Sequence, residues 1–231
     1  MATSLLTSIV AVDFIKRSIP TFAISALLML AVLVGTPSIV RSQPPCPNDP
    51  ACPWTPAVLD INAFEVAPGR LCDITIAYCY RSCNGRCEIL FREWKFYDRA
   101  CIQGVTLDQT FYARLFRAIA VHLMGRGNDA CSQEIPPCPN STPIFSFMRS
   151  SCVKWTVDSL VPDVVIRSCG YSALCTTENT FCYDNSTTPP NVVMNLVAVG
   201  GNNCPASSTP LSFPAIFPTT TYESPCYTTC Y

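Results

Sequence analysis

Charged side chains are scarce in this chain of 231 residues, because Asp, Glu, Lys and Arg together make up only 13% of it. The 15 basic and 16 acidic residues leave a net charge of -1. Nucleic-acid-binding proteins normally carry a basic stripe, so this balance argues against that class. A disordered acidic protein is also excluded, since 49% of the residues are hydrophobic. We therefore expect a folded protein that binds no nucleic acid.

Histidine is almost absent, His122 being the only one, and no two cysteines stand in a C-x2-C spacing. Zinc ribbons, zinc knuckles and thioredoxin-like sites mostly depend on that spacing, which argues against a metal or redox centre. A Ser–His–Asp triad would rest on His122 alone, and no serine lies in a G-x-S-x-G sequence. Phosphate loops and dinucleotide fingerprints are missing too. The sequence predicts no catalytic residue, no metal ligand and no cofactor.

A long apolar run is also missing, since the uncharged apolar stretch between Arg17 and Arg41 covers only residues 22–34. A membrane span needs about 20 apolar residues, whereas a signal-peptide core needs roughly 7–15. We interpret residues 1–42 as a secretory signal peptide. Residues 1–15 lack the positive charge that usually begins such a peptide, and we interpret them as the result of a start codon assigned too far upstream. The alternative is an uncleaved anchor that uses the longer stretch 19–40. After cleavage, no contact with a membrane is expected.

Cysteine, in contrast, is abundant: the chain has 16, all of them after the predicted signal peptide. An even number of cysteines in an exported chain is typical of a disulfide framework, because oxidising compartments let disulfides form and persist. We therefore predict structural disulfides rather than a metal site. The spacing alone does not determine which cysteines pair.

An Asn-Gly pair at 84–85 indicates a tight turn between two alternating segments, 71–81 and 87–97. If the loop has three residues, Cys83 lies opposite Cys87 and the two can bridge. If it has two, these thiols point to opposite faces of the hairpin.

The two-residue loop would also place Arg81 opposite Glu88, which is a favourable charge pair across the strands. Short spacings make six cysteines the candidates for local bridges. The candidate pairs are Cys83–Cys87, Cys226–Cys230 and Cys46–Cys52.

One amphipathic helix is predicted at 107–124. Thr106 and Gln109 form a capping-box pattern at its start. Phe111 and Leu115 lie one turn apart at the centre of its apolar arc, so both should be buried against a sheet.

Further strands are indicated at 152–158 and 164–168, and a hairpin at 180–184 with 192–199. The fold class that follows is α+β and β-rich, with small antiparallel sheets, one amphipathic helix and multiple disulfides.

The chain is expected to contain one disulfide-rich globular domain at 58–204. The proline-rich segment 43–57 is predicted to be an extended leader. Residues 205–231 are rich in Pro, Ser and Thr and are predicted to form an irregular strap, pinned by Cys226 and Cys230 but not packed into the core.

Two groups of side chains and one histidine are candidates for a functional site. Glu88, Glu93 and Asp98 lie on or beside one strand, and paired carboxylates can hydrolyse glycosides; solvated strand charges facing arginines are the preferred interpretation. Aromatic side chains on the same hairpin could bind sugar rings, but core packing is preferred. These aromatic residues are Tyr78, Tyr80, Trp94 and Phe96. His122 lies in the apolar half of the helix, where packing is again preferred.

The lack of catalytic signals favours a non-enzymatic structural or interaction module. Its expected location is extracellular, which includes a bacterial periplasm or cell surface, and its expected partner is an extracellular protein or a glycan. A secreted hydrolase and a carbohydrate-binding module are the alternatives. A solvent-facing carboxylate pair in a deep cleft would favour the hydrolase, and a flat row of exposed aromatics the sugar binder.

Overall fold

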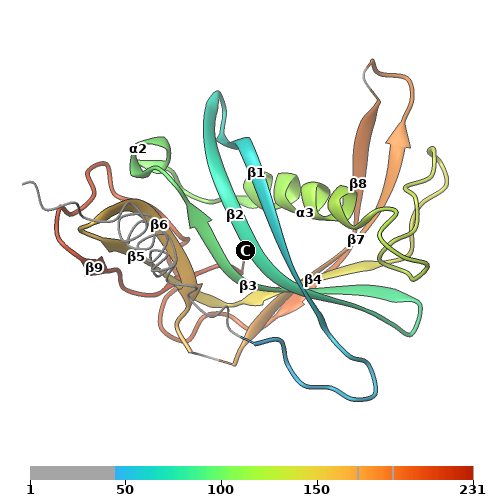
Figure 1. Ribbon diagram of the computed structural model, residues 1–231, viewed down its shortest axis with the longest axis horizontal. Coiled ribbons are helices and arrows are strands. Elements are labelled where there is room, and N and C mark those ends of the chain that lie inside the picture. The colour runs from blue at the N-terminus through green and yellow to red at the C-terminus, as the bar shows by residue number, and fades with distance from the viewer. Residues whose placement is uncertain (1–44, 171, 189, 231) are drawn as a thin grey trace, which may run out of the picture. The chain divides into compact units, whose positions relative to one another are not determined.

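A computed structural model describes residues 45–170, 172–188 and 190–230, which all belong to the compact unit 43–231. The predicted signal peptide, residues 1–42, lies outside the described residues. Within them, ten strands form one sheet, accompanied by two helices (Figure 1). The strands are β1 (Thr55–Ala67), β2 (Arg70–Cys83), β3 (Arg86–Phe96), β4 (Phe145–Ser150), β5 (Cys152–Asp158), β6 (Val161–Ser168), β7 (Leu174–Asp184), β8 (Asn191–Gly201), β9 (Tyr222–Glu223) and β10 (Tyr227–Thr228). The helices are α2 (Arg99–Ile102) and α3 (Gln109–Leu123).

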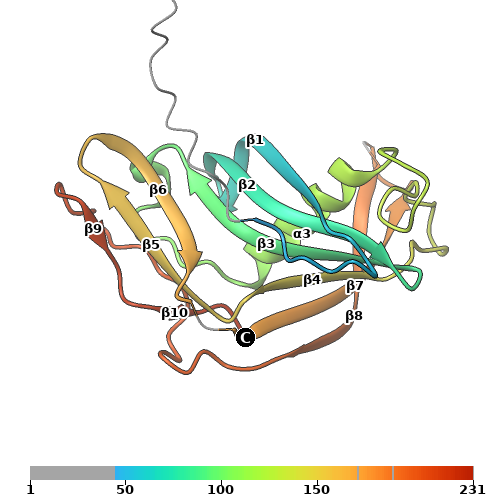
Figure 2. The ribbon, with the colours of Figure 1, turned by 60° about the horizontal axis from the view of Figure 1, so that its bottom comes forward.

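Strand β3 is the centre of the sheet. One of its edges pairs with β2, and β2 pairs in turn with β1. The other edge is shared: residues 87–90 pair with β4 and residues 93–96 with β6. The sheet therefore divides into two wings, β6–β5 with the short β9 and β10, and β4–β7–β8 (Figures 1 and 2).

The β-rich class is confirmed, but the prediction of small antiparallel sheets is wrong. The sheet has ten strands and is mixed, because β3 and β4 run parallel. Parallel neighbours need a long crossover connection, and the segment that contains α3 supplies it. Strand periodicity reports which residues share a face, and it says nothing about the direction of a neighbouring strand.

The β2–β3 hairpin has the two-residue turn. Asn84 and Gly85 both take positive φ angles, 52° and 72°, which is the conformation that Asn-Gly favours in tight hairpins. The predicted pair Arg81–Glu88 is confirmed, since the two residues are register partners and their Nε and Oε2 atoms lie 2.5 Å apart. Cys83 lies opposite Arg86, so the Cys83–Cys87 bridge is wrong.

All sixteen cysteines form disulfides, which confirms the framework. The pairs are Cys46–Cys79, Cys52–Cys83, Cys72–Cys101, Cys87–Cys131, Cys138–Cys182, Cys152–Cys204, Cys169–Cys226 and Cys175–Cys230. Every bridge joins residues at least 29 apart in the sequence. The framework therefore staples distant segments and closes no short local loop.

The other two local pairs, Cys46–Cys52 and Cys226–Cys230, are also wrong. Cys46 and Cys52 both bridge to β2, because the proline-rich segment before β1 runs beside that strand. Cys226 bridges to the residue after β6 and Cys230 to β7, so the C-terminal segment joins the two wings.

Strand β1 was not expected at its observed length. It begins at Thr55, inside the predicted leader, and its register with β2 shifts after Ile61 and again after Glu65. Ala63 has a φ of 53° between those points. Such bulges break the period-two pattern that a strand prediction relies on, which explains why the sequence did not reveal β1.

Helix α3 confirms the amphipathic prediction, with one correction at its start. Its N-cap is Asp108, whose carboxylate accepts from the backbone N–H of Phe111 at 2.9 Å. The predicted cap, Thr106, instead shares a hydrogen bond of 2.9 Å with Ser212. The apolar arc lies on the sheet as expected: the Phe111 ring lies 6.0 Å from that of Trp94, and the Phe116 ring stacks 4.2 Å from that of Phe147.

The C-terminal segment is more than a strap. Leu211, Phe213 and Phe217 are buried, and Phe213 makes an edge contact with Phe96 of β3 at 5.8 Å. The expectation that this tail stays unpacked is therefore wrong. Its high proline and serine content gave no sign that these three apolar side chains would be buried. They pack because disulfides hold the segment against the sheet.

A candidate ligand-binding cavity

A cavity of about 470 Å³ lies between α3 and the wing formed by β4, β7 and β8, and we call it the α3–β8 cavity. Figure 2 shows the three strands side by side below the helix. Binding sites for small molecules commonly have volumes of about 300–1,000 Å³. The cavity is therefore large enough for a small organic ligand.

Arginine dominates the polar part of its wall. Arg114 and Arg117 project from α3, one turn apart, and Arg149 comes from β4. Arg149 is only 4% exposed, and its guanidinium lies over the ring of Tyr112 at 4.5 Å. Its Nη1 donates to Thr177 Oγ1 at 3.0 Å. The side chain is thus held between a helix and a strand in one orientation.

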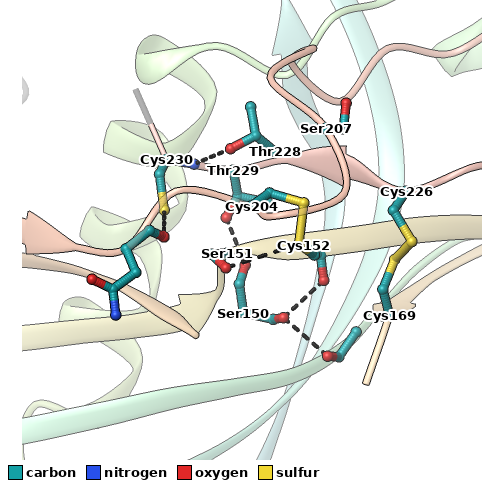
Figure 3. Close-up of a disulfide and its surroundings, with 12 residues drawn as sticks. Ser150, Ser151, Cys152, Cys169, Cys204, Ser207, Cys226, Thr228, Thr229 and Cys230 are labelled. Atoms are coloured by element: carbon teal, nitrogen blue, oxygen red, sulfur yellow. Dashed lines mark hydrogen bonds between the residues drawn. A yellow bond between two sulfur atoms is a disulfide. The ribbon is translucent and has the colours of Figure 1, made fainter. Parts of the chain in front are cut away.

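Hydrogen bonds to the C-terminal segment hold Arg149 in place. The Thr229 carbonyl accepts from Nη2 of Arg149 at 2.9 Å, and the Thr229 amide donates to the Ser151 carbonyl at 3.0 Å. The Thr229 hydroxyl also donates to the Ser150 carbonyl at 2.6 Å (Figure 3). Next to it, Cys230 is bridged to Cys175 of β7. The disulfides therefore position the cavity as well as stabilise the fold.

The opposite wall of the cavity is apolar and open to solvent. It comes from β8, where Met194, Leu196 and Val199 line the cavity. Leu196 and Val199 are 61% and 62% exposed, although such side chains are usually buried. Among the described residues that line the cavity none is acidic. The cavity is therefore amphipathic and carries positive charge on its helix side.

Asn179 and Arg117 in the cavity wall each have one buried polar atom that makes no hydrogen bond. Asn179 on β7 has no exposed surface, yet its Oδ1 atom makes no hydrogen bond. Nε of Arg117 is also buried and makes none. An unsatisfied buried polar group costs about 1–3 kcal/mol, so such groups call for an explanation. A ligand that reaches them is one.

The three candidate carboxylates do not form a hydrolytic site. Glu88 pairs with Arg81, and Glu93 pairs with Arg167 at 2.7 Å. Asp98 is the N-cap of α2, where it accepts from a backbone amide. Two of the three carboxylates are thus paired with arginines, and none of the three lines the α3–β8 cavity.

The aromatic candidates belong mainly to the core, in agreement with the interpretation preferred from the sequence. Tyr78, Trp94 and Phe96 are buried, and Tyr80 is half-buried. The rings of Trp94 and Phe96 pack against Phe111 of α3. They therefore form no exposed platform for sugar rings.

His122 lies near the C-terminal end of α3, half-buried against Tyr78, with its Nδ1 3.5 Å from Arg126. Burial of the ring, and then the positive charge of Arg126, lower its pKa below the usual 6.5. The residue does not line the α3–β8 cavity.

Substituting Arg126→Gln is expected to raise the pKa of His122 while leaving it below 6.5, because burial is the larger cause of the shift. Since the unfolded state binds this proton more tightly than the folded state, stability should fall as the pH decreases through 6.5. The chain has a single histidine, so one imidazole signal in an NMR titration measures the pKa directly. A pKa above 6.5 in the parent protein would contradict the packing described.

Sequence reasoning did not identify the cavity. One signal was available: Arg149 interrupts an otherwise apolar and small-residue strand, FSFMRS, where a charge is unusual. A second was the absence of any charge from β8. Neither signal predicts that β8 lies beside α3.

Fold and cavity together define a disulfide-stapled, β-rich protein with an amphipathic, arginine-lined cavity. Comparisons with protein-family models, curated proteins and solved structures find no match for the chain. In the part of the chain that the structure describes, no helix is long and apolar enough to cross a membrane. Among the same residues, no cluster of His, Cys, Asp and Glu could hold a metal ion.

Proposed function

We propose that this protein is a secreted, non-enzymatic binding module that holds a small amphipathic ligand in the α3–β8 cavity. The observation that carries the proposal is the cavity itself, which combines fixed polar groups on one side with exposed apolar side chains on the other. Pockets for small molecules have this composition: a mostly apolar lining with a few placed polar groups.

The disulfide framework supports an extracellular location. Disulfides form and persist in oxidising compartments and are rare in reducing ones. Eight bridges that involve every cysteine fit secretion, in agreement with the predicted signal peptide.

The lining also favours binding over hydrolysis. Glycoside hydrolysis needs two carboxylates across the scissile bond. The described residues of the cavity wall include no Asp or Glu, whereas they include guanidinium, amide and hydroxyl groups that can orient a ligand. An extracellular carrier or receptor for a small molecule needs no more than this.

The neutral fluorescent probe N-phenyl-1-naphthylamine is expected to bind the refolded protein with increased, blue-shifted emission. Ala113 faces the cavity from α3, so Ala113→Trp should occupy part of it and weaken binding by at least about tenfold, or about 1.4 kcal/mol. Val121, which is on the same helix but exposed and outside the cavity wall, provides the control Val121→Trp.

Leu196→Ser removes an apolar side chain from the open side of the cavity and is expected to weaken binding of the probe. The melting temperature should not change, since Leu196 is largely exposed. This variant keeps the test decisive if Ala113→Trp folds poorly. Absence of probe binding, or equal binding by all variants, would overturn the proposal.

A further inference from the structure

We infer that the ligand of the α3–β8 cavity is an amphipathic organic anion: a carboxylate, sulfate or sulfonate group on an apolar body, with a hydrogen-bond donor nearby. The inference rests on the proposed binding function and adds the chemical class of the ligand. It is carried by Arg117 and Asn179, which line the cavity and each contain a buried polar atom that makes no hydrogen bond.

Arg117 provides the charge. It makes no ion pair with any carboxylate among the described residues, whereas Arg114, one turn away, is neutralised by Glu65 at 2.9 Å. Nε of Arg117 is buried and unpartnered beside the cavity. Guanidinium presents its N–H donors in a planar fork that matches carboxylates and related anions. An anionic group is the ligand chemistry that satisfies both its charge and its donors.

Asn179 provides the second contact. Its side chain is completely buried on β7, and its Nδ2 lies 3.5 Å from the Thr177 carbonyl. This contact assigns Oδ1, the acceptor, as the free atom of the amide. A free acceptor needs an O–H or N–H donor. An anion that also carries a hydroxyl or an amine can therefore hydrogen-bond to Oδ1 of Asn179, whereas an anion that carries only acceptors cannot.

The apolar body of the ligand follows from β8. Leu196 and Val199 face the cavity yet remain more than half exposed, and a ligand lying along the strand would cover them. Burial of apolar surface is favourable, so these contacts supply affinity, while Arg117 makes the site select for negative charge. A fully polar anion such as inorganic phosphate would leave this wall exposed to water.

Two fluorescent probes with one aromatic framework test the inference. 1-Anilinonaphthalene-8-sulfonate and N-phenyl-1-naphthylamine both carry an N–H donor, and only the first carries an anionic group. The refolded parent protein is expected to bind the sulfonate about tenfold more tightly or better, a ratio that corresponds to about 1.4 kcal/mol.

Arg117→Gln should abolish most of this preference while leaving the neutral probe unaffected. The matched control is Arg126→Gln, which removes the same charge from an exposed arginine outside the cavity wall and should preserve the preference. Raising the salt concentration should weaken binding of the sulfonate but not binding of the neutral probe, because salt screens partly exposed charges.

The outcomes separate the two proposals. If neither probe binds, the cavity is no ligand site and the proposed function fails. If the neutral probe binds and Ala113→Trp displaces it, but the parent protein shows no preference for the sulfonate, the cavity binds a ligand and the inference of an anion fails. A preference that persists equally in Arg117→Gln and falls in Arg126→Gln would assign the anion to the outer surface and overturn the inference too.

Discussion

Reduction of the disulfides is expected to unfold this protein completely. A bridge typically contributes about 2–4 kcal/mol by restricting the unfolded chain, and more for longer loops. Here the bridged residues are separated by 29 to 57 positions, so the loops are long. Eight such contributions together exceed the net stability of about 5–15 kcal/mol that a folded domain has. The reduced chain should therefore lose its near-ultraviolet circular dichroism at 25 °C.

A strong chelator is the control for this experiment, and it should leave the melting temperature unchanged because the described residues offer no metal-ligand cluster. A thiol reagent added to the denatured, unreduced protein should find no reactive cysteine, since all sixteen are bridged. Four or more reactive thiols, or a melting temperature lowered by the chelator alone, would contradict the disulfide framework.

Truncation of Phe111 is expected to have the largest effect of any substitution in α3. Its ring is completely buried and packs against Phe64 at 5.6 Å and Trp94 at 6.0 Å. Phe111→Ala removes these contacts and leaves a cavity that the rigid sheet cannot fill, at a cost of about 3–5 kcal/mol. The midpoint of unfolding in urea, measured without reductant, gives the change.

Arg117→Ala is the matched control on the same helix, with an expected loss of stability of about 0.5 kcal/mol or less, because the residue makes no ion pair with the described carboxylates and Nε makes no hydrogen bond. The two substitutions should therefore separate stability from binding: Phe111→Ala lowers the unfolding midpoint, and Arg117→Ala lowers the affinity for an anionic probe. If Phe111→Ala left the midpoint unchanged, α3 would be a docking helix rather than part of the core.

Where local chemistry decides the structure, prediction from the sequence succeeded. The Asn84-Gly85 turn determines the register that pairs Arg81 with Glu88, because only two residues connect the strands. Strand β5 has the predicted bounds, 152–158, since its alternation is unbroken. Phe111 and Leu115 are buried as predicted, because the spacing of apolar residues on a helix selects the face that packs.

Short spacings between cysteines, in contrast, were a poor guide to pairing. Cys83 and Cys87 are near in the sequence, but the pleat of the hairpin sends them to opposite faces, and each bridges to a segment outside the hairpin. Disulfide pairing depends on which backbone segments come within reach, and long-range packing sets that distance.

The candidate cavity likewise depends on tertiary structure alone. Its charged wall comes from α3 and β4, its buried amide from β7 and its apolar wall from β8, segments that span residues 109 to 201. The parallel pairing of β4 with β3 and the C-terminal contacts of Arg149 bring these segments together.

The sequence by itself therefore determined the β-rich composition of the fold, the presence of a disulfide framework, the central hairpin and the buried face of the helix, because composition, turn chemistry and periodicity act over a few residues. Only the tertiary structure decided which cysteines pair, how the sheet divides around β3 and where an arginine-lined cavity forms. These features arise from contacts between residues tens of positions apart, and no local pattern encodes such contacts.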